Sequence, residues 1–563
     1  MVGPATGRIV VTSRIVVLGG GFGGMYAARA LKRRLGRAAE IELVNAENYF
    51  VFQPLLPEVG AGSITPAHAV SPLRFLLRDV FVRKATVDSV DFDRRLVTVF
   101  QGVQRRPTEI GYDHLVIALG QAADLSKMPG LEEHALTMRT LEDARRLRAH
   151  VIGQLEHAQI TRLPEVKRGA LTFCVVGGGF SGIETAGEMK DLIDRSLKFY
   201  PDIDPSEVRM IVVEFADRIL GEMSQGLADY ATRTLRERGI EVKLGTGVAS
   251  ATGTQLVTTT GEVIDTRTIV ATIGNAPSPV VRRMGLPSER GRISVDRTLA
   301  VKGRSDVWAL GDCALIALKD APQGPRDYAP PTAQFAVREA EQLAENIAST
   351  LTGGTPQPFD YRSKGALASL GARKGVAQVF GLELKGFPAW LLWRFYYLAF
   401  LPGLTTRIFV LLNWFMDGIS PRSVVQLHTR SVPPTRYVRY RAGDVIYEAG
   451  NRSDGFYTVV TGAVEMTRTD PETGLPQVRT IGPGGHFGER LILGATRRQT
   501  SVRAAEDTKV LVMDREEFLK LADSFQAFRD YFGPYMARHG MTWPPLGETD
   551  GQAAPKPVPT EKD

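Results

Sequence analysis

Cysteine is scarce in this chain, whose 563 residues contain two, Cys174 and Cys313, each in its own apolar segment. Two such residues form neither a disulfide framework nor a metal cluster, so we expect no metal site and a reducing compartment. The sequence also lacks an uncharged apolar run of about 18 residues, which a membrane-spanning helix requires. The N-terminal stretch lacks the apolar core of a signal peptide. These absences predict a protein of the cytosol or of the cytosolic face of a membrane.

Charge of one sign is not in large excess either. The chain has 69 Lys and Arg residues against 62 Asp and Glu residues, a net charge of +7. A basic balance suits nucleic acid or an anionic membrane, but no dense Lys/Arg run with interleaved aromatic residues is present, so we expect no nucleic-acid binding. At about 100–200 residues per domain, the length predicts three or four domains.

Glycine, by contrast, is arranged in a fingerprint that occurs twice. Near the N-terminus the apolar strand Ile15–Leu18 leads into a G-x-G-x-x-G spacing and then into an Ala-rich helical pattern. The first glycine permits a tight turn, the second lets backbone approach a pyrophosphate, and the third lets the helix pack closely on the strand. A second copy lies in residues 171–190. The residues of the two fingerprints are Gly19, Gly21, Phe22, Gly23 and Gly24 in the first copy and Gly177, Gly179, Phe180 and Gly182 in the second.

Two fingerprints in one chain predict two bound dinucleotides, and hence an electron donor and an electron acceptor. The alternative is that both are plain strand-to-helix turns, and the strand–turn–helix context of each copy argues against it. The second unit continues to a strand that ends at Glu214, where a carboxylate can bind both ribose hydroxyls and repel the 2′-phosphate of NADP. The matching position of the first unit is Asn45, a departure from the fingerprint.

A third segment assigns the first unit to FAD. Residues 307–314 form a strand that ends in Gly311-Asp312, and such an Asp contacts the flavin ribitol in flavoproteins with two dinucleotides. Residues 112–120, which end at Gly120, are similar to the strand and turn that precede the nicotinamide domain of that fold. We therefore expect the first unit to bind FAD and the second to bind NADH as substrate.

These patterns predict an α/β fold with two Rossmann-like dinucleotide-binding domains, followed by an amphipathic membrane-docking helical segment and a β-roll that resembles cyclic-nucleotide-binding domains. The expected boundaries are 12–125 and 291–385 for the FAD-binding domain, 126–164 for a helical connector, 165–290 for the NADH-binding domain, 386–430 for the docking segment, 433–545 for the β-roll domain and 546–563 for a disordered tail.

The segment after Asn45 decides between reaction classes. Disulfide reductases of the two-dinucleotide fold need a redox-active cysteine pair beside the flavin, and residues 46–59 contain no cysteine. That class is therefore excluded. The stretches N-Y-F-x-F-Q-P-L-L-P-E-V (48–59), G-G-G-F-S-G-I-E-T-A-G-E (177–188) and P-P-T-A-Q-F-A (330–336), together with the aromatic segment 386–427, resemble type II NADH:quinone oxidoreductases. The resemblance covers about residues 12–430.

The resemblance implies a quinone as the electron acceptor. It places Glu184 near the nicotinamide and places Ala333 and Gln334 near the flavin ring, where a quinone headgroup approaches; Glu184 and Gln334 are the catalytic candidates. The alternative for Glu184 is an acid that interacts with the helix dipole. The chain departs from the family at Arg338-Glu339, where the family has further glutamines. This pair either changes the acceptor or forms a solvated helix face. Further cofactor contacts are expected at Gln53, Val87, Gly120, Gly274 and Gly311.

The segment 387–416 is rich in aromatic residues but too short between charges to span a bilayer. It suits two short helices in the membrane interface, with Trp390, Trp393, Tyr397 and Trp414 at headgroup level. The resemblance supports peripheral attachment to the cytoplasmic face of the cell membrane. A buried hairpin or a homodimer interface is the alternative.

Residues 486–504 resemble the phosphate-binding cassette of cyclic-nucleotide-binding domains. Backbone N–H groups after Gly488 can bind an anion, Glu489 can accept from a ribose hydroxyl, and Arg498 can pair with a phosphate. The full set of expected contacts is Phe487, Gly488, Glu489, Arg498, Gln499 and Thr500. The bulky Leu491 and the charged Arg497 depart from the family pattern, so a domain that has lost its ligand is the alternative to binding of cyclic AMP.

The sequence thus predicts an enzyme of the type II NADH dehydrogenase kind, which passes electrons from NADH through FAD to a quinone and is regulated by a cyclic nucleotide. Two other functions stay open. One is a redox sensor with slow turnover that responds to a cyclic nucleotide. The other is a soluble NADH-dependent reductase of a non-quinone acceptor.

Overall fold

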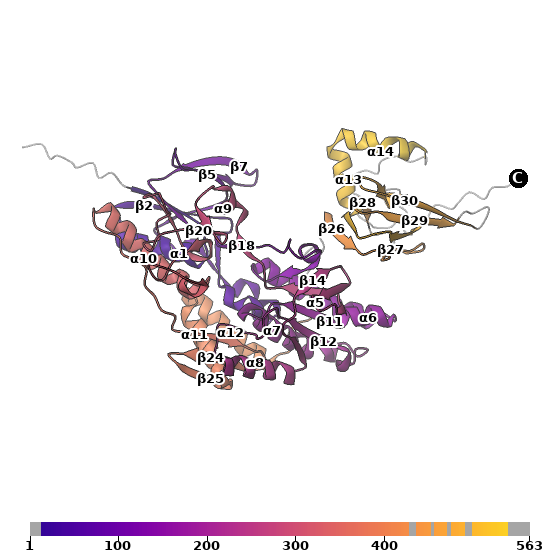
Figure 1. Cartoon of the computed structure of the whole chain (residues 1–563), viewed down its shortest axis with the longest axis horizontal. Helices are drawn as coiled ribbons and strands as arrows, with labels where there is room; N and C mark the ends of the chain where they lie inside the picture. Colours follow the sequence, from indigo (N-terminus) through magenta and orange to yellow (C-terminus); the bar gives the residue numbers. More distant parts are fainter. Residues whose placement is uncertain (1–12, 427–434, 452–454, 470–474, 490–497, 539–563) are drawn as a thin grey trace, which may run out of the picture. The chain divides into compact units, whose positions relative to one another are not determined.

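The computed structural model describes most of the chain and divides it into two compact units. The described residues are 13–426, 435–451, 455–469, 475–489 and 498–538. The first unit comprises residues 1–249 and 256–429, and the second comprises residues 250–255 and 430–563. The predicted tail and the positions of Leu491 and Arg497 lie outside the described residues. Each unit is described by itself (Figure 1).

The first unit begins with a seven-stranded sheet of order β21-β8-β1-β2-β5-β6-β7. Strand β1 pairs in parallel with β2 and β8, and β5, β6 and β7 form an antiparallel extension. Every residue of β8 is buried, as expected of a parallel strand covered on both faces. The strands are β1 (Ser13–Leu18), β2 (Ala39–Asn45), β5 (Phe81–Asp91), β6 (Leu96–Gln101), β7 (Arg106–Gly111), β8 (His114–Ile117) and β21 (Val307–Ala309).

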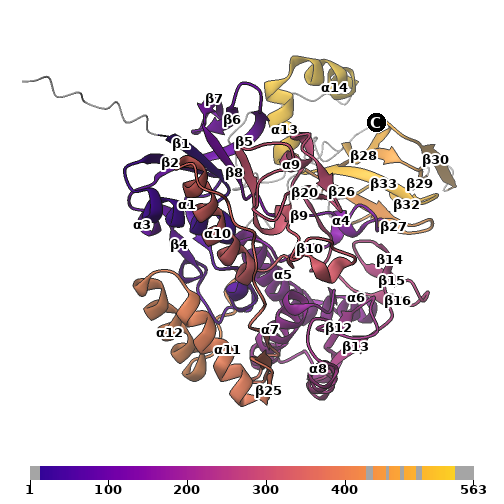
Figure 2. The same ribbon diagram turned by 60° about the vertical axis from the view of Figure 1, so that its left-hand side comes forward.

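Helices α1 (Phe22–Leu35) and α10 (Ala333–Leu351) pack against each other beside this sheet, although some 300 residues separate them in the sequence (Figure 2). Residues that follow the second dinucleotide unit therefore return to complete the first one. This return explains why the FAD-binding domain is predicted in two parts.

The second sheet of this unit is parallel throughout and has the order β10-β17-β11-β12-β13. Its strands are β10 (Leu136–Thr137), β11 (Thr172–Val176), β12 (Arg209–Val213), β13 (Ile240–Lys243) and β17 (Thr268–Ala271). The helices of this region are α4 (Leu131–His134), α5 (Leu141–Ile160), α6 (Pro164–Leu171), α7 (Phe180–Ser196) and α8 (Gln225–Glu237).

Small sheets and short helices complete the first unit. The strands are β3 (Tyr49–Val51), β4 (Val70–Pro72), β9 (Gln121–Ala123), β14 (Val248–Ala251), β15 (Gln255–Thr258), β16 (Val263–Asp265), β18 (Asn275–Pro277), β19 (Ser288–Glu289), β20 (Arg292–Ser294), β22 (Ala314–Leu315), β23 (Gly365–Ser369), β24 (Gly375–Val379) and β25 (Leu382–Gly386). The helices are α2 (Leu56–Gly60), α3 (Leu73–Leu76), α9 (Pro279–Arg283), α11 (Phe387–Phe400) and α12 (Leu404–Ile419).

The α11–α12 hairpin follows the antiparallel β23–β25 sheet and turns at Pro402-Gly403, where the two helices are interrupted. Within the described residues, no helix has the length and the apolar character needed to cross a membrane.

The second unit is a β-roll of two four-stranded sheets followed by two helices. The sheet orders are β26-β33-β28-β31 and β27-β32-β29-β30. The elements are β26 (Thr435–Tyr440), β27 (Val445–Tyr447), β28 (Phe456–Thr461), β29 (Val464–Thr469), β30 (Pro476–Ile481), β31 (His486–Phe487), β32 (Ser501–Ala504), β33 (Thr508–Met513), α13 (Arg515–Ser524) and α14 (Gln526–Arg538). The predicted fold class, two α/β dinucleotide-binding domains, a helical segment and a β-roll, is confirmed.

Candidate active site

Both glycine fingerprints adopt the same strained turn. Gly19 has φ +102° and Gly177 has φ +113°, a backbone conformation that L side chains rarely adopt. A Cβ on Gly24 would lie 1.8 Å from the carbonyl oxygen of Gly19. The third glycine of the motif is therefore required because its helix packs against the backbone of the first.

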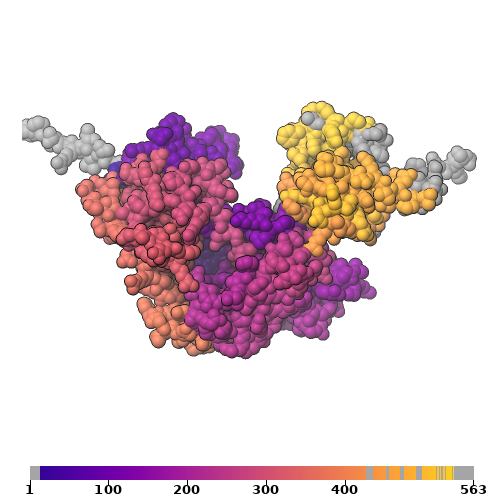
Figure 3. Space-filling view, in the orientation of Figure 1, coloured from indigo at the N-terminus to yellow at the C-terminus, as the bar shows by residue number. Residues whose placement is uncertain are grey.

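The second copy repeats this contact, since a Cβ on Gly182 would lie 1.9 Å from the carbonyl oxygen of Gly177. The middle glycine of each fingerprint differs from the first and the third. A Cβ on Gly21 or Gly179 would meet nothing within 4 Å, so the protein leaves open space there. Open space beside the N-terminus of a helix fits the close approach of a pyrophosphate. Figure 3 shows the first unit hollowed between its two lobes, with N-terminal residues in indigo at the bottom of the hollow.

The strand-end residues hold the two turns in the same way. Asn45 Oδ1 accepts a hydrogen bond from Gly20 N at 2.8 Å. A Glu214 carboxylate oxygen accepts from Gly178 N, and the other accepts from Ala216 N at 2.7 Å. Both side chains are thus placed beside their fingerprint, and Glu214 adds a negative charge that Asn45 lacks.

The Gly311-Asp312 turn lies at the end of β21, as predicted. Gly311 has φ +69° and its N–H donates to Glu339 Oε2 at 2.7 Å. Burial raises the pKa of Asp312, and Arg292 and Arg139 oppose this shift. A carboxylate between two arginines and close to a buried acid suits a hydroxyl-rich ligand such as a ribitol chain.

Glu339 has a structural role beside the Gly311-Asp312 turn that the sequence did not indicate. The two interpretations of Arg338-Glu339, a changed acceptor or a solvated helix face, both require accessible side chains. Glu339 is only 2% exposed, however. Arg338 is half-buried, with its guanidinium over the Tyr361 ring. Burial raises the pKa of Glu339 to about 8. The spacing of Phe335, Glu339 and Leu343 on the buried face of α10 is the signal that marks this position.

Glu184 lies in the first turns of α7 and is buried, so it is not a solvent-facing acid of the helix dipole. Its Oε1 accepts hydrogen bonds from Trp393 Nε1 at 2.7 Å and from Ser369 N at 3.1 Å. Burial raises its pKa to about 8 and outweighs both hydrogen bonds, which lower it. At neutral pH Glu184 therefore carries a proton in the interior of the protein.

A chain of aromatic contacts joins the two fingerprints near Glu184. Phe22 of α1 lies 5.6 Å from Phe52 between ring centroids, and Phe52 lies 5.9 Å from Tyr397. Tyr397 in turn contacts Trp393 edge-on at 4.8 Å. The helix that follows the first fingerprint and the acid that follows the second are thus connected through side chains of α11.

The remaining predicted contacts are spread over the first unit. Gln334, in the first turn of α10 next to Ala333, accepts from Ser363 Oγ at 3.1 Å. Gln53 is exposed and Val87 is buried on β5. Gly120 and Gly274 both have positive φ, +62° and +82°.

The structure corrects the predicted placement of two tryptophans. Trp393 and Trp414 were expected at headgroup level, but they are 2% and 9% exposed. The indole of Trp414 donates to both carboxylate oxygens of Glu58 at 3.1 Å, and the indole of Trp393 donates to one oxygen of Glu184 at 2.7 Å. Each indole N–H satisfies a buried acid, so both rings face inward. Trp390 and Tyr397 are half-buried, and burial raises the pKa of the Tyr397 hydroxyl.

Other apolar side chains form the outer surface of the hairpin. The exposed fraction is 62% at Phe395, 65% at Phe415 and 73% at Leu404. The large exposed apolar residues of the hairpin are Phe387, Leu391, Phe395, Phe400, Leu404, Ile408, Phe409, Leu411, Leu412, Phe415, Met416 and Ile419.

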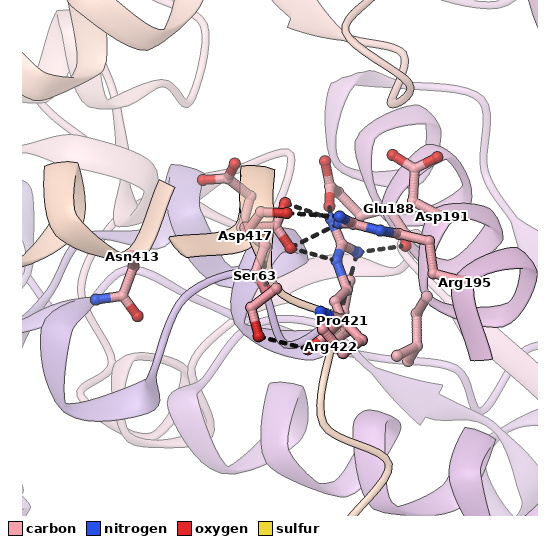
Figure 4. A network of polar contacts seen from close by, with 12 residues as sticks. Ser63, Glu188, Asp191, Arg195, Asn413, Asp417, Pro421 and Arg422 are labelled. Atoms are coloured by element: carbon pink, nitrogen blue, oxygen red, sulfur yellow. Dashed lines mark hydrogen bonds and ion pairs between the residues drawn. The ribbon is translucent and has the colours of Figure 1, made fainter. Parts of the chain in front are cut away.

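A buried ion-pair network fastens the end of α12 to α7 (Figure 4). Arg422 donates to Asp417 at 2.9 Å and to Glu188 at 3.2 Å, and Arg195 donates to Asp417 at 2.7 Å. Arg422 is 7% exposed, so its charge requires these partners. The hairpin is therefore a fixed part of the first unit.

In the second unit Arg498 is 6% exposed. Its Nη2 donates to the carbonyl of Gly455 at 2.8 Å, and its guanidinium lies 4.1 Å from the Tyr447 ring centroid. Gly488 has φ +82°, and a Cβ there would lie 2.6 Å from Arg498 Nη1.

The other residues of the cassette differ in their burial. Phe487 is buried and stacks on Tyr457 at 5.0 Å. Glu489 and Thr500 are half-buried, and Gln499 is exposed. The arginine expected to bind a phosphate is thus held by backbone and aromatic rings in this structure.

The fold and the paired glycine turns define the class of flavin- and pyridine-nucleotide-dependent oxidoreductases with two dinucleotide sites. Residues 13–340 match the pyridine nucleotide-disulphide oxidoreductase family, residues 363–423 match the NDH2 C-terminal domain, and residues 437–525 match the cyclic nucleotide-binding domain.

Comparison with known proteins identifies a family within this class. A type II NADH:quinone oxidoreductase, Ndh, of Mycobacterium tuberculosis is 30% identical over 428 residues, which cover 73% of this chain and 89% of the relative. Demethylphylloquinone reductase NdbB of Synechocystis is 31% identical and covers 71% and 95%. The structure of NDH2 from Plasmodium falciparum in complex with NADH superposes with a TM-score of 0.68 at 20% identity, covering 74% of this chain and all of that one. The chain therefore belongs to the type II NADH:quinone oxidoreductases, a family of NADH dehydrogenases.

Proposed function

We propose that this enzyme oxidises NADH through FAD bound at the first fingerprint and passes the electrons to a quinone. The observation that carries the proposal is the contact chain from Phe22 to Glu184, because it joins the two dinucleotide turns at one place. The open space at Gly21 and the acid at Asp312 fit FAD, and Glu214 fits the adenosine ribose of NADH. When bound, the flavin accepts hydride and returns the electrons to the acceptor.

Glu184 is the proposed proton-holding residue of the reaction. NADH delivers two electrons and one proton as hydride, and reduction of a quinone to the quinol requires two electrons and two protons. One further proton must therefore reach the acceptor. Glu184 has a pKa raised to about 8 and a fixed orientation through Trp393, so it holds a proton at neutral pH at the end of the contact chain that begins at Phe22. Gln334 is proposed to contact the quinone headgroup.

The acceptor is tested by anaerobic turnover in liposomes with NADH and a series of acceptors. The proposal predicts that a quinone analogue supports the fastest NADH oxidation. Rapid reduction of a soluble dye with no turnover of any quinone would instead identify a reductase of another acceptor. Very slow turnover with every acceptor would favour the redox sensor.

The exposed apolar residues of α11 and α12 support peripheral docking at the cytoplasmic face of the membrane. Changing Phe395→Glu together with Phe415→Glu should release the enzyme from vesicles with its flavin retained, because both rings face outward. The matched control changes Ile160→Glu and Phe199→Glu, which are exposed on other elements of the first unit. Equal vesicle binding of both double variants would contradict docking through the hairpin and leave a dimer interface as its role.

The cyclic-nucleotide family match of the second unit supports a second proposal, that this unit binds cyclic AMP and thereby regulates the enzyme. Any regulation requires that the nucleotide bind two states of the enzyme with different affinity. Arg498 would have to exchange the Gly455 carbonyl for the phosphate. Calorimetry of the full chain with cyclic AMP and cyclic GMP tests binding; absence of heat at millimolar nucleotide would leave a structural role for the domain.

A further inference from the structure

A pocket of about 470 Å³ lies between three helices and a hairpin turn, outside the contact chain that joins the two dinucleotide turns. It is lined by α7, by the β23–β24 turn, by the N-terminal half of α11 and by the C-terminal end of α12. Its volume is within the range of small-ligand sites. We call it the arginine pocket after the four arginines in its lining, Arg195, Arg373, Arg394 and Arg422.

Arg394 lines the wall of the arginine pocket, and some of its N–H donors have no acceptor among the described residues. Its guanidinium carbon lies 4.3 Å from the Trp390 ring centroid and 4.5 Å from that of Trp414. Among the described residues its hydrogen-bond partner is Glu58, at 3.3 Å from Nη2, and its buried Nε has none. A guanidinium has five N–H donors, so the two Nη atoms retain donors for an anionic ligand besides the one that Glu58 uses.

Three of the four arginines already pair with acids, so the positive character left for a ligand comes from Arg373 and from the further N–H donors of Arg394. Asp417 accepts from Arg195 and Arg422, and Asp191 pairs with Arg238. Glu188 pairs with Arg422 at 3.2 Å, and this cation opposes the rise in the Glu188 pKa that burial causes.

Arg373 adds an exposed cation at the mouth of the pocket. Within the part of the chain that the structure describes, no ion pair involves this residue. It has φ +58° and the preceding Ala372 has φ +47°, a conformation that costs free energy at residues other than glycine, asparagine or aspartate. The turn therefore holds a strained arginine beside the pocket.

The arginine pocket adjoins the exposed apolar residues of the hairpin. Phe387 lines the pocket and is itself 54% exposed, and Leu391 and Ile419 are exposed on the same ends of α11 and α12. A ligand in the pocket would thus have its anionic end at the arginines and an apolar remainder along the outer surface of the helices.

We propose that the arginine pocket binds the phosphate headgroup of an anionic membrane phospholipid, whose acyl chains follow the exposed apolar residues of α11 and α12. This inference rests on the proposed docking of the hairpin at a membrane. Arginine pairs with phosphate oxygens through two parallel N–H donors and stacks on aromatic rings, and Arg394 offers both features. The apolar surface beside the pocket favours a lipid over free phosphate, and the net charge of +7 suits an anionic membrane.

Calorimetry of the full-length, FAD-loaded enzyme with short-chain lipids tests the proposal. Dihexanoyl phosphatidylglycerol and dihexanoyl phosphatidylcholine, below their micelle-forming concentrations, share the same apolar part and differ in headgroup charge. The wild type should bind the phosphatidylglycerol in preference. Arg373→Ala should weaken that binding about fivefold, as expected for one basic residue at an anionic surface. Arg394→Lys, which keeps a cation beside Glu58, should weaken it about tenfold through loss of the two-donor geometry.

The matched control is Arg162→Ala, which removes one exposed arginine from the loop between α5 and α6. It should leave the affinity for phosphatidylglycerol unchanged. Equal affinity for the two lipids, or equal effects of Arg162→Ala and Arg373→Ala, would overturn the proposal. Inorganic phosphate that binds as tightly as the lipid would also overturn it, because the site would then recognise the free anion.

These dissolved lipids need no membrane, so the result is separate from the docking test with Phe395 and Phe415. Loss of vesicle binding in that double variant, together with retained phosphatidylglycerol binding in solution, would support both proposals. Retained vesicle binding in that variant would contradict docking through the hairpin even if the short-chain lipid binds the arginine pocket.

Discussion

The FAD-side turn and the NADH-side turn of the first unit have the same backbone and different side chains at the strand end. In both turns the third glycine packs on the carbonyl of the first, at nearly the same distance. In both turns the strand-end residue accepts a hydrogen bond from the second residue of the motif. Asn45 is neutral and Glu214 is charged, so we propose that the shared backbone binds a pyrophosphate and that the strand-end residue selects the dinucleotide.

Each dinucleotide-binding domain also contains a buried glutamic acid. Glu339 accepts the N–H of Gly311 on the FAD side, and Glu184 accepts the indole N–H of Trp393 on the NADH side. Burial raises the pKa of each to about 8. Glu339 accepts from a turn, whereas Glu184 lies in the contact chain that begins at Phe22, so we propose that similar pKa values serve different roles.

The largest effect is expected from Gly24→Ala and Gly182→Ala. Each adds a Cβ less than 2 Å from a backbone carbonyl, which should cost roughly 3 kcal/mol or more because backbone cannot move aside as a side chain does. Gly24→Ala should yield protein without FAD, and Gly182→Ala should keep FAD and lose NADH-dependent reduction. The flavin content and thermal unfolding of the purified variants check this. Gly221→Ala, where the added Cβ meets nothing within 4 Å, is the control and should behave as wild type.

Glu184→Gln should lower turnover with a quinone on the order of a hundredfold, since general acid–base groups contribute about 10²–10⁴ in rate. The amide oxygen still accepts from Trp393, so the fold and the KM for NADH should change little. Glu339→Gln, the equivalent change on the FAD side, should leave turnover close to wild type. Steady-state kinetics across pH separate the two variants, and equal losses in both would refute a proton-holding role specific to Glu184.

Glu214→Gln should lower kcat/KM for NADH about tenfold, because the carboxylate bonds to the ribose hydroxyls are weakened. Glu214→Arg should also raise the use of NADPH, since it replaces repulsion of the 2′-phosphate by attraction. Initial rates with the two nucleotides measure both effects, with Glu132→Gln as a control on an exposed acid. If the wild type oxidised NADPH as well as NADH, Glu214 would not be the selecting residue.

The effect expected to change activity least is a pH dependence of stability. The pKa of Glu339 is about 8 in the folded protein against 4.5 in its model value, so the stability that this group contributes is fully present below about pH 4.5 and is lost as the pH rises through about 8. Glu339→Gln should remove this dependence, which amounts to at most a few kcal/mol. Thermal unfolding between pH 6 and pH 9, roughly the range in which the folded acid ionises, measures it. An unchanged slope in the variant would show that Glu339 is not the titrating group.

The backbone of the site could be predicted from the sequence because glycine spacing reports it directly. Gly19, Gly24, Gly177 and Gly182 all occupy the positions that the fingerprint requires. Glu214 could also be predicted, since it lies at a fixed distance along the chain from its motif.

Side chains that depend on distant partners could not be predicted. The aromatic content of α11 and α12 does not tell which rings face inward, and Trp393 and Trp414 do so because acids more than 200 residues earlier accept their N–H groups. Glu339 was read as accessible for the same reason, because its partner Gly311 comes from another part of the FAD-binding domain. In the second unit, the burial of Arg498 depends on Gly455 and two tyrosines, none of which belongs to the cassette pattern.

Electron transfer from NADH to a quinone can be followed by anaerobic mixing of the purified, FAD-loaded enzyme with NADH and then with a quinone analogue. We expect NADH to bleach the visible absorbance of the flavin, an equal concentration of NADPH to bleach it far more slowly, and the quinone to restore the absorbance within the time of one turnover. A flavin that NADH does not bleach, or that stays reduced in the presence of the quinone, would contradict the claim that this chain passes electrons from NADH to a quinone.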